Sequence, residues 1–304
     1  PARPEAADFL AGLSGIDPAA AHDEGVAQKA AAAFTEYLAR ARAAGWADCT
    51  PGRFLLPGDL EGSPVLTFAP LPLPENPRRA SLWWQMQRRF EGYKSGVVRP
   101  FFAAHFARID RQVVLLDVLD AVHRGPAALA DLRRVMAEVL GAFRPGDNSF
   151  LGSLLRGRRV ERILFAATKA DHLHHSQHDR LTALTEALLR EARDRARFRG
   201  AETMALSLAA LRATTEEQRP HQGALRDLVR GITLEGRQAA FHPGDLPADP
   251  WRLLEPGADG GAWMQGDFAA MRFAPPQLER RPGQGLPHIR LDRAAEFLLG
   301  DRLI

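Results

Sequence analysis

The chain has 304 residues, of which 45% are hydrophobic and 25% are charged, and this is the composition of an ordinary globular protein. Its 40 Lys and Arg residues exceed its 37 Asp and Glu residues by three, so charge gives no support for nucleic-acid binding. Cys49 is the single cysteine, which excludes an intrachain disulfide and a cysteine-based zinc site.

The sequence shows neither a membrane-spanning segment nor a signal peptide. No stretch is long and apolar enough to cross a bilayer, and the first residues show no signal-peptide pattern. Together with the single cysteine, this favours a cytoplasmic protein and leaves only peripheral association with a membrane open. The length suits one large domain or two smaller ones.

Residues 1–107 are predicted to be mainly helical, and they either precede the main core or are inserted into it. Apolar residues recur at helical spacing from Ala27 to Leu38, and Gly45 is a suitable end for that helix. Pro-Gly turns follow, and a short strand is predicted at 65–68 before a proline-rich linker.

A second long helix is predicted from Trp83 to about Phe106, where Pro100 would kink or split it. The adjacent Trp83 and Trp84 favour a helix that packs on its own domain. A face for docking a protein partner is the alternative.

Three apolar runs predict strands buried on both faces, at 111–119, 162–167 and 202–211. Helical patterns lie between them, and Ser176 is the expected N-cap of the second helix, with Asp179 at its third position. Strands and helices therefore alternate over residues 108–211, which predicts an α/β fold with a parallel sheet.

The remaining sequence is less regular. Residues 212–285 lose their periodicity and gain Pro and Gly, which predicts an irregular or small-strand insertion. Residues 286–304 are expected to return to the core as a strand at 287–291 and an Asp292-capped helix that runs through Leu299.

The second apolar run stops at Thr168-Lys169-Ala170-Asp171, which has the form [N/T]-K-x-D that selects guanine in P-loop proteins. Guanine offers two adjacent N–H donors that the Asp171 carboxylate can accept together, whereas adenine presents an acceptor in place of one donor. Each charge-assisted bond contributes about 1.5–3 kcal/mol. The stem of Lys169 can cover the base while its ammonium stays in water, and the Thr168 hydroxyl can tie neighbouring loops together.

Other polar residues near the motif give weaker signals. His172, His174, His175 and His178 follow the motif, but their spacing is more typical of an exposed turn than of a metal site, so no metal ligand is predicted. Asp117 ends a predicted strand without a partner base, which favours a structural carboxylate near Gly125. No catalytic residue is identified.

Taken together, these blocks resemble the YcjX-like family of P-loop NTPases, which are bacterial stress-associated proteins with a Ras-like GTP-binding core. The resemblance covers most of the chain, in the family's order. It is carried by the blocks at 51–59, 105–112, 164–172, 213–215 and 286–292. It implies a partial Ras-like parallel sheet with a large helical insertion and an irregular C-terminal insertion.

Position by position, the resemblance assigns Thr168, Lys169 and Asp171 to guanine recognition. The second base-contacting segment, through backbone amides, is assigned to Ala209, Ala210 and Leu211. Members of the family often carry Ser where this chain has Ala210. The implied ligands are GTP or GDP with Mg²⁺.

The phosphate-binding motif of P-loop proteins, G-x-x-x-x-G-K-[ST], does not occur in the 304 residues. The expectation is a C-terminal portion of a longer GTP-hydrolysing regulatory or stress protein, in which an upstream loop binds phosphate and Mg²⁺. This portion alone is not expected to be active. The alternative is a non-catalytic interaction module that uses the helical region around Trp83 and Trp84.

Overall fold

The computed structural model describes residues 4–46, 58–105, 109–142, 160–221, 223–255, 272–276, 278 and 285–303. The chain divides into two compact units, Pro1–Arg108 and Ile109–Ile304. The turn-rich stretch at 51–57, with Cys49, and the connection at 146–159 lie outside the described residues.

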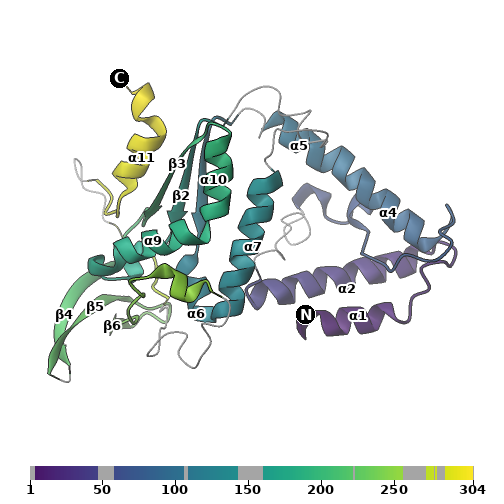
Figure 1. Ribbon diagram of the computed structural model, residues 1–304. Helices are drawn as coiled ribbons and strands as arrows, with labels where there is room; N and C mark the ends of the chain where they lie inside the picture. Colours follow the sequence, from purple (N-terminus) through teal and green to yellow (C-terminus); the bar gives the residue numbers. More distant parts are fainter. Residues whose placement is uncertain are drawn as a thin grey trace. The chain divides into compact units, whose positions relative to one another are not determined.

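The first unit is helical where it is described (Figure 1). Its longer helices are α1 (Ala7–Leu13), α2 (Glu24–Ala43), α4 (Leu82–Tyr93) and α5 (Arg99–Ala104), with short 3₁₀ turns η1 (Pro4–Ala6), η2 (Gly58–Leu60) and η3 (Pro64–Leu66). The strand predicted at 65–68 is wrong, because Ser63 and Pro64 start the η3 turn instead: the Ser63 hydroxyl accepts a hydrogen bond from the Val65 N–H.

Capping and proline explain where these helices begin and break. Asp23 accepts a hydrogen bond from the Val26 N–H at 2.9 Å, and Ser81 caps α4 through the Trp84 N–H. A five-residue π turn, Lys94–Val98, separates α4 from α5, and Pro100 lies in the first turn of α5. The split before Pro100 follows from its missing N–H donor and its fixed φ.

Aromatic and small side chains form the core of this unit. The buried members of this core are Phe9, Ala27, Ala30, Phe68, Ala69, Leu82 and Met86. Trp84 is not among them and is 37% exposed. No helix in the described part of the chain has the length and apolar character needed to span a bilayer.

The second unit contains a parallel sheet of β1 (Arg111–Leu116), β2 (Arg162–Ala167) and β3 (Glu202–Ser207), in the order β1-β2-β3. The pairing register places Leu116, Ala167 and Ser207 level with one another at the carboxyl ends of the strands. Strands and helices alternate along the chain, and the predicted α/β class with a parallel sheet is confirmed.

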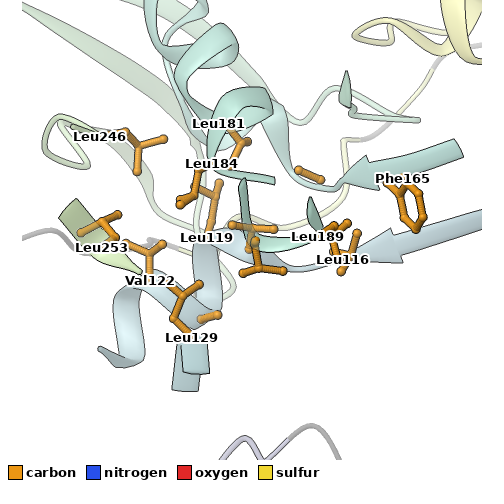
Figure 2. Packing of buried hydrophobic residues seen from close by; sticks show 14 of the residues in the cluster. Leu116, Leu119, Val122, Leu129, Phe165, Leu181, Leu184, Leu189, Leu246 and Leu253 are labelled. Atoms are coloured by element: carbon orange, nitrogen blue, oxygen red, sulfur yellow. The ribbon is translucent and has the colours of Figure 1, made fainter. Parts of the chain in front are cut away.

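Helices cover both faces of this sheet (Figure 1). They are α6 (Val118–Arg124), α7 (Pro126–Ala142), α9 (His178–Leu188), α10 (Arg190–Phe198) and α11 (Leu291–Leu299). Leu119, Leu129, Phe165 and Leu181 belong to the main core on one face, as Figure 2 shows. On the other face, Phe297 of α11 packs with apolar side chains of β2 and β3.

Only β2 is buried on both faces, so the prediction for the two neighbouring strands is corrected. Val113 and Leu115 of β1 are 44% and 63% exposed, and Met204 of β3 is 36% exposed. These strands lie at the two edges of the described sheet. The apolar side chains that α11 packs against include Leu164 and Ala166 of the central strand β2. The first strand also stops at Leu116, because Asp117 caps α6.

The region after β3 is more regular than the sequence suggests. It contains an antiparallel sheet of β4 (Thr214–His221), β5 (Ala224–Ile232) and β6 (Gln238–Phe241), followed by the 3₁₀ turn η8 (Pro250–Leu253). The sequence predicts an irregular or small-strand insertion at 212–285, and the described residues of this region form small strands.

Two predicted caps are wrong. Ser176 lies inside the 3₁₀ turn η7 (His175–Gln177), and its hydroxyl donates to Asp227 at 2.9 Å instead of capping α9. Asp292 lies within the first turn of α11, whose N-cap is Arg290. The strand expected at 287–291 is reduced to an isolated bridge between Ala209 and Ile289.

Candidate functional site

The Thr168–Asp171 loop follows β2 directly, at the carboxyl end of the sheet. Thr168 binds this loop to the neighbouring strand, because its N–H and its hydroxyl both donate to the Leu116 carbonyl, at 2.8 and 3.1 Å. The expectation that this hydroxyl ties neighbouring segments together therefore matches the geometry. Ligands of open α/β sheets bind at this edge.

Lys169 has a left-handed backbone, with φ 62° and ψ 32°. Such a conformation costs a non-glycine residue about 1–3 kcal/mol and is concentrated at functional sites. Its ammonium Nζ lies 2.5 Å from Oδ2 of Asp117, whose other oxygen accepts the Asp120 N–H at the start of α6. Asp117 therefore caps α6 and contacts Lys169, and its expected support of the loop near Gly125 stays a prediction.

Asp171 is 4% exposed, and it lies in the 3₁₀ turn η6 (Ala170–His172). Its Oδ2 accepts the Ala213 N–H at 2.9 Å, and its carbonyl accepts a hydrogen bond from the Thr214 hydroxyl. Within the described residues no hydrogen bond reaches Oδ1, and this oxygen is not one of the fully buried unpaired side-chain atoms. Oδ1 is therefore open to water or to a ligand, while Oδ2 is fixed by the Ala213 N–H.

The segment after β3 lies next to this loop. The Ala170 N–H donates to the Leu208 carbonyl at 3.1 Å, which joins the two loops. Ala209 pairs with Ile289 in both directions, at 3.1 and 2.8 Å, so its N–H is already used. Ala210 is exposed, and in the described part of the chain the N–H groups of Ala210 and Leu211 donate no hydrogen bond.

His178, the first residue of α9, is hydrogen-bonded to the backbone of the motif loop. Its Nε2 donates to the carbonyls of Ala170 and Leu173, at 2.8 and 3.3 Å. Burial, aided by the charge of Arg290, lowers the pKa of His178 from 6.5, so the ring is neutral near pH 7. A neutral ring with one N–H donor suits two carbonyl acceptors.

Arg290 connects this support to the C-terminal helix. Its guanidinium contacts the hydroxyl of Ser207, which itself donates to the His178 carbonyl at 3.1 Å. Like Lys169, Arg290 has a left-handed backbone, at φ 57°, and these two are the non-glycine residues with positive φ in the part of the chain that the structure describes. Sequence spacing does not reveal these contacts, because they join positions 29 and 83 residues apart.

The structure therefore brings most of the expected site residues together and adds others. Thr168, Lys169, Asp171 and the Ala209–Leu211 segment lie at the ends of adjacent strands. Ala213, Thr214, His178 and Arg290 are not singled out as site residues by the sequence, although 213–215 and 286–292 belong to the blocks that carry the resemblance. Asp171 offers an acceptor and Ala210 an N–H donor on two loops that the Ala170–Leu208 hydrogen bond joins, and a planar group that offers the complementary donor and acceptor suits such a pair.

No cluster in the described residues suits Mg²⁺. In the described residues, His174, His175 and Glu216 have potential metal-ligand atoms within 4.8 Å of one another. Two of these ligands are imidazoles, whereas Mg²⁺ takes oxygen ligands in octahedral geometry. None of the described residues is therefore assigned to Mg²⁺.

Comparison with known proteins gives a consistent result. The sequence pattern of the YcjX-like family, DUF463, matches residues 1–303. The chain is 36% identical over 298 residues to "Ras-like GTPase YcjX" of Escherichia coli K12 and 31% identical over 308 residues to the protein of that name from Shewanella oneidensis. These matches cover 95% and 98% of the chain, which spans 62% of the length of each relative.

Proposed function

Because this chain belongs to the YcjX-like family, we propose that the protein containing it binds a guanine nucleotide, with the base between the Thr168–Asp171 loop and Ala210. Asp171 accepts the two N–H donors of guanine, and the Ala210 N–H donates to its carbonyl oxygen. Lys169 covers one face of the base with its aliphatic stem.

The observation that carries this proposal is the state of the Asp171 carboxylate. The residue is buried, Oδ2 is positioned by the Ala213 N–H, and Oδ1 has no partner among the described residues. Each carboxylate oxygen has two lone pairs, so Oδ2 can accept a further bond. A base that lacks the matching donors would leave this buried charge unpaired, which is the larger part of selectivity.

The proposal extends to GTP hydrolysis by the longer protein, as in the relatives named Ras-like GTPase. Phosphate and Mg²⁺ would be bound by residues outside these 304, since no G-x-x-x-x-G-K-[ST] loop is present here. A regulatory role in stress and a cytoplasmic location remain proposals that follow from the resemblance.

Competition between GDP and ADP for the full-length protein tests the base assignment. We expect GDP to bind at least about 100-fold more tightly, because two charge-assisted bonds contribute about 3 kcal/mol or more. Asp171→Ala should remove this preference, while Asp292→Ala, which changes an exposed carboxylate of α11, should keep it. Equal binding of GDP and ADP by the unmodified protein would contradict the assignment.

A second candidate is supported by the first unit, where an interaction module remains the alternative. Trp84 is exposed, and a pocket of about 410 Å³ lined mainly by aromatic and aliphatic side chains, among them Trp83, Phe90 and Tyr93, lies in the same unit. Partner capture that is lost in Trp84→Ala but kept in Gln85→Ala, with helix content unchanged, would favour this function.

A further inference from the structure

Four polar side chains meet beside the motif loop, where η7 packs against the antiparallel sheet. They are His174 and His175, just before and at the start of η7, Glu216 of β4 and Asp227 of β5. Sequence spacing favours surface histidines, but it does not show that two carboxylates more than 40 residues away face them.

Three of these residues place their ligand atoms around one point. Nδ1 of His175 lies 2.6 Å from Oε2 of Glu216, and Nε2 of His174 lies 3.8 Å from the same oxygen. Ligand atoms of all three residues lie within 4.8 Å of one another. Adjacent ligands on a tetrahedral ion with bonds of about 2.0–2.2 Å are separated by a little over 3 Å, so small side-chain rotations suffice.

His174 is oriented for this use. Its side chain is 7% exposed, and its Nδ1 lies 2.9 Å from the Ser176 hydroxyl and 3.2 Å from Oδ2 of Asp227, while Nε2 faces Glu216. Nδ1 also accepts the Ser176 N–H at 3.4 Å. Metal binding at Nε2 would place the ring proton on Nδ1 in place of that contact, where Asp227 and the Ser176 hydroxyl can accept it, as in the usual outer-shell arrangement of zinc sites. Asp227 is itself held by the Ser176 hydroxyl and the Gln218 amide.

The local charge also favours a cation. Glu216 and Asp227 are two anions, and Arg212, whose Nη2 lies 3.1 Å from Oε1 of Glu216, is one cation. Arg212 therefore occupies Oε1 and leaves Oε2 for a ligand.

We propose that His174, His175 and Glu216 bind a divalent transition-metal ion of the Zn²⁺ class, with Asp227 as the positioning carboxylate. Two imidazoles and one carboxylate are a donor set that Zn²⁺ accepts and Mg²⁺ does not. The three protein ligands leave a fourth position for water or for a further group.

The ion joins the segment after the motif to β4. Thr214, at the start of β4, contacts the Asp171 carbonyl, and Glu216 is two residues further along the strand. Metal binding therefore stabilises the strand that positions Asp171, whether or not the base is guanine. The inference does not depend on the proposed function.

Metal content and a spectroscopic probe test the site in the full-length protein. After removal of metal with a chelator, titration with Zn²⁺ should give one bound ion per chain, and Co²⁺ should give the visible absorption typical of tetrahedral coordination. His174→Asn and His175→Asn should each remove this absorption. His221→Asn, which changes an exposed histidine on β4, should keep it.

Two conservative variants separate ligation from an ordinary ion pair. Glu216→Gln keeps the side-chain shape and should abolish the Co²⁺ spectrum, while Asp227→Asn should keep it with about 10- to 100-fold weaker affinity. The unfolding transition of each metal-free variant, compared with that of the metal-free unmodified protein, shows whether the variant is folded. Absent binding by the unmodified protein, or binding that His174→Asn and His175→Asn leave unchanged, would overturn the proposal and leave a hydrogen-bonded ion pair.

Discussion

The loops after β2 and after β3 lie side by side, and they present different groups to the proposed base. The loop after β2 offers side chains, with a buried carboxylate at Asp171 and a strained backbone at Lys169. The loop after β3 offers a backbone N–H group, because Ala209 and Ala210 carry only methyl side chains. The Ala209 N–H already donates to the Ile289 carbonyl, so the donor is that of Ala210. Substitutions should therefore have large effects in the first loop and small effects in the second.

Lys169→Ala should have the largest effect among the changes that spare Asp171. It removes the stem that covers the base and the ion pair with Asp117, so GDP binding by the full-length protein should weaken about tenfold. Lys94→Ala, which removes a half-exposed lysine paired with Glu91, is the matched control and should bind normally. Unchanged GDP affinity in Lys169→Ala would remove Lys169 from the site.

Thr214→Val tests how far the first loop depends on its support. Valine keeps the shape but cannot donate to the Asp171 carbonyl, so the free energy of unfolding should fall by about 1–2 kcal/mol and GDP binding should weaken a few-fold. Denaturant midpoints and equilibrium binding measure both effects. Thr215→Val, at the exposed next position, should change neither.

Ala210 tests the backbone character of the second loop. Ala210→Ser should bind GDP within about twofold of the unmodified protein, since it keeps the N–H donor. Ala210→Pro removes that donor and should weaken GDP binding by about fivefold, which is the loss of about 1 kcal/mol. Equal binding by the serine and proline variants, at equal unfolding midpoints, would show that the Ala210 N–H does not contact the base.

The support under the first loop should also make stability depend on pH. The pKa of His178 is lowered in the folded protein, mainly by burial, so protonation favours the unfolded state. Its contribution is complete above about pH 6.5 and is lost as the pH falls below that value. His178→Gln should unfold more easily near pH 7 and lose less stability than the unmodified protein between about pH 7 and pH 5.5.

The sequence marks the first loop with a motif and leaves the second unmarked, for a physical reason. The proposed selection of guanine by side chains corresponds to a readable motif at Thr168–Asp171, and a buried strand such as β2 gives a continuous apolar run. Backbone donors leave no such motif, so only the family resemblance assigns Ala209–Leu211.

Contacts between distant segments explain most of what the sequence does not predict. Local spacing makes Ser176 the cap of α9, yet its hydroxyl is used by Asp227, 51 residues away. The same β5 carboxylate faces His174, and Glu216 of β4 faces His175, so local spacing alone hides the candidate metal site. The edge strand β1 ends in the continuous apolar run Val113–Leu116, which predicts burial, although Leu115 is 63% exposed.

The most direct test of base selection is the nucleotide preference of Asp171→Asn in the full-length protein. Xanthine presents a carbonyl where guanine has its amino group, and an asparagine amide can donate to that carbonyl. We predict that the variant loses at least about 100-fold in GDP affinity and binds xanthosine diphosphate more tightly than GDP. A variant that still prefers GDP over xanthosine diphosphate would contradict the role given to Asp171.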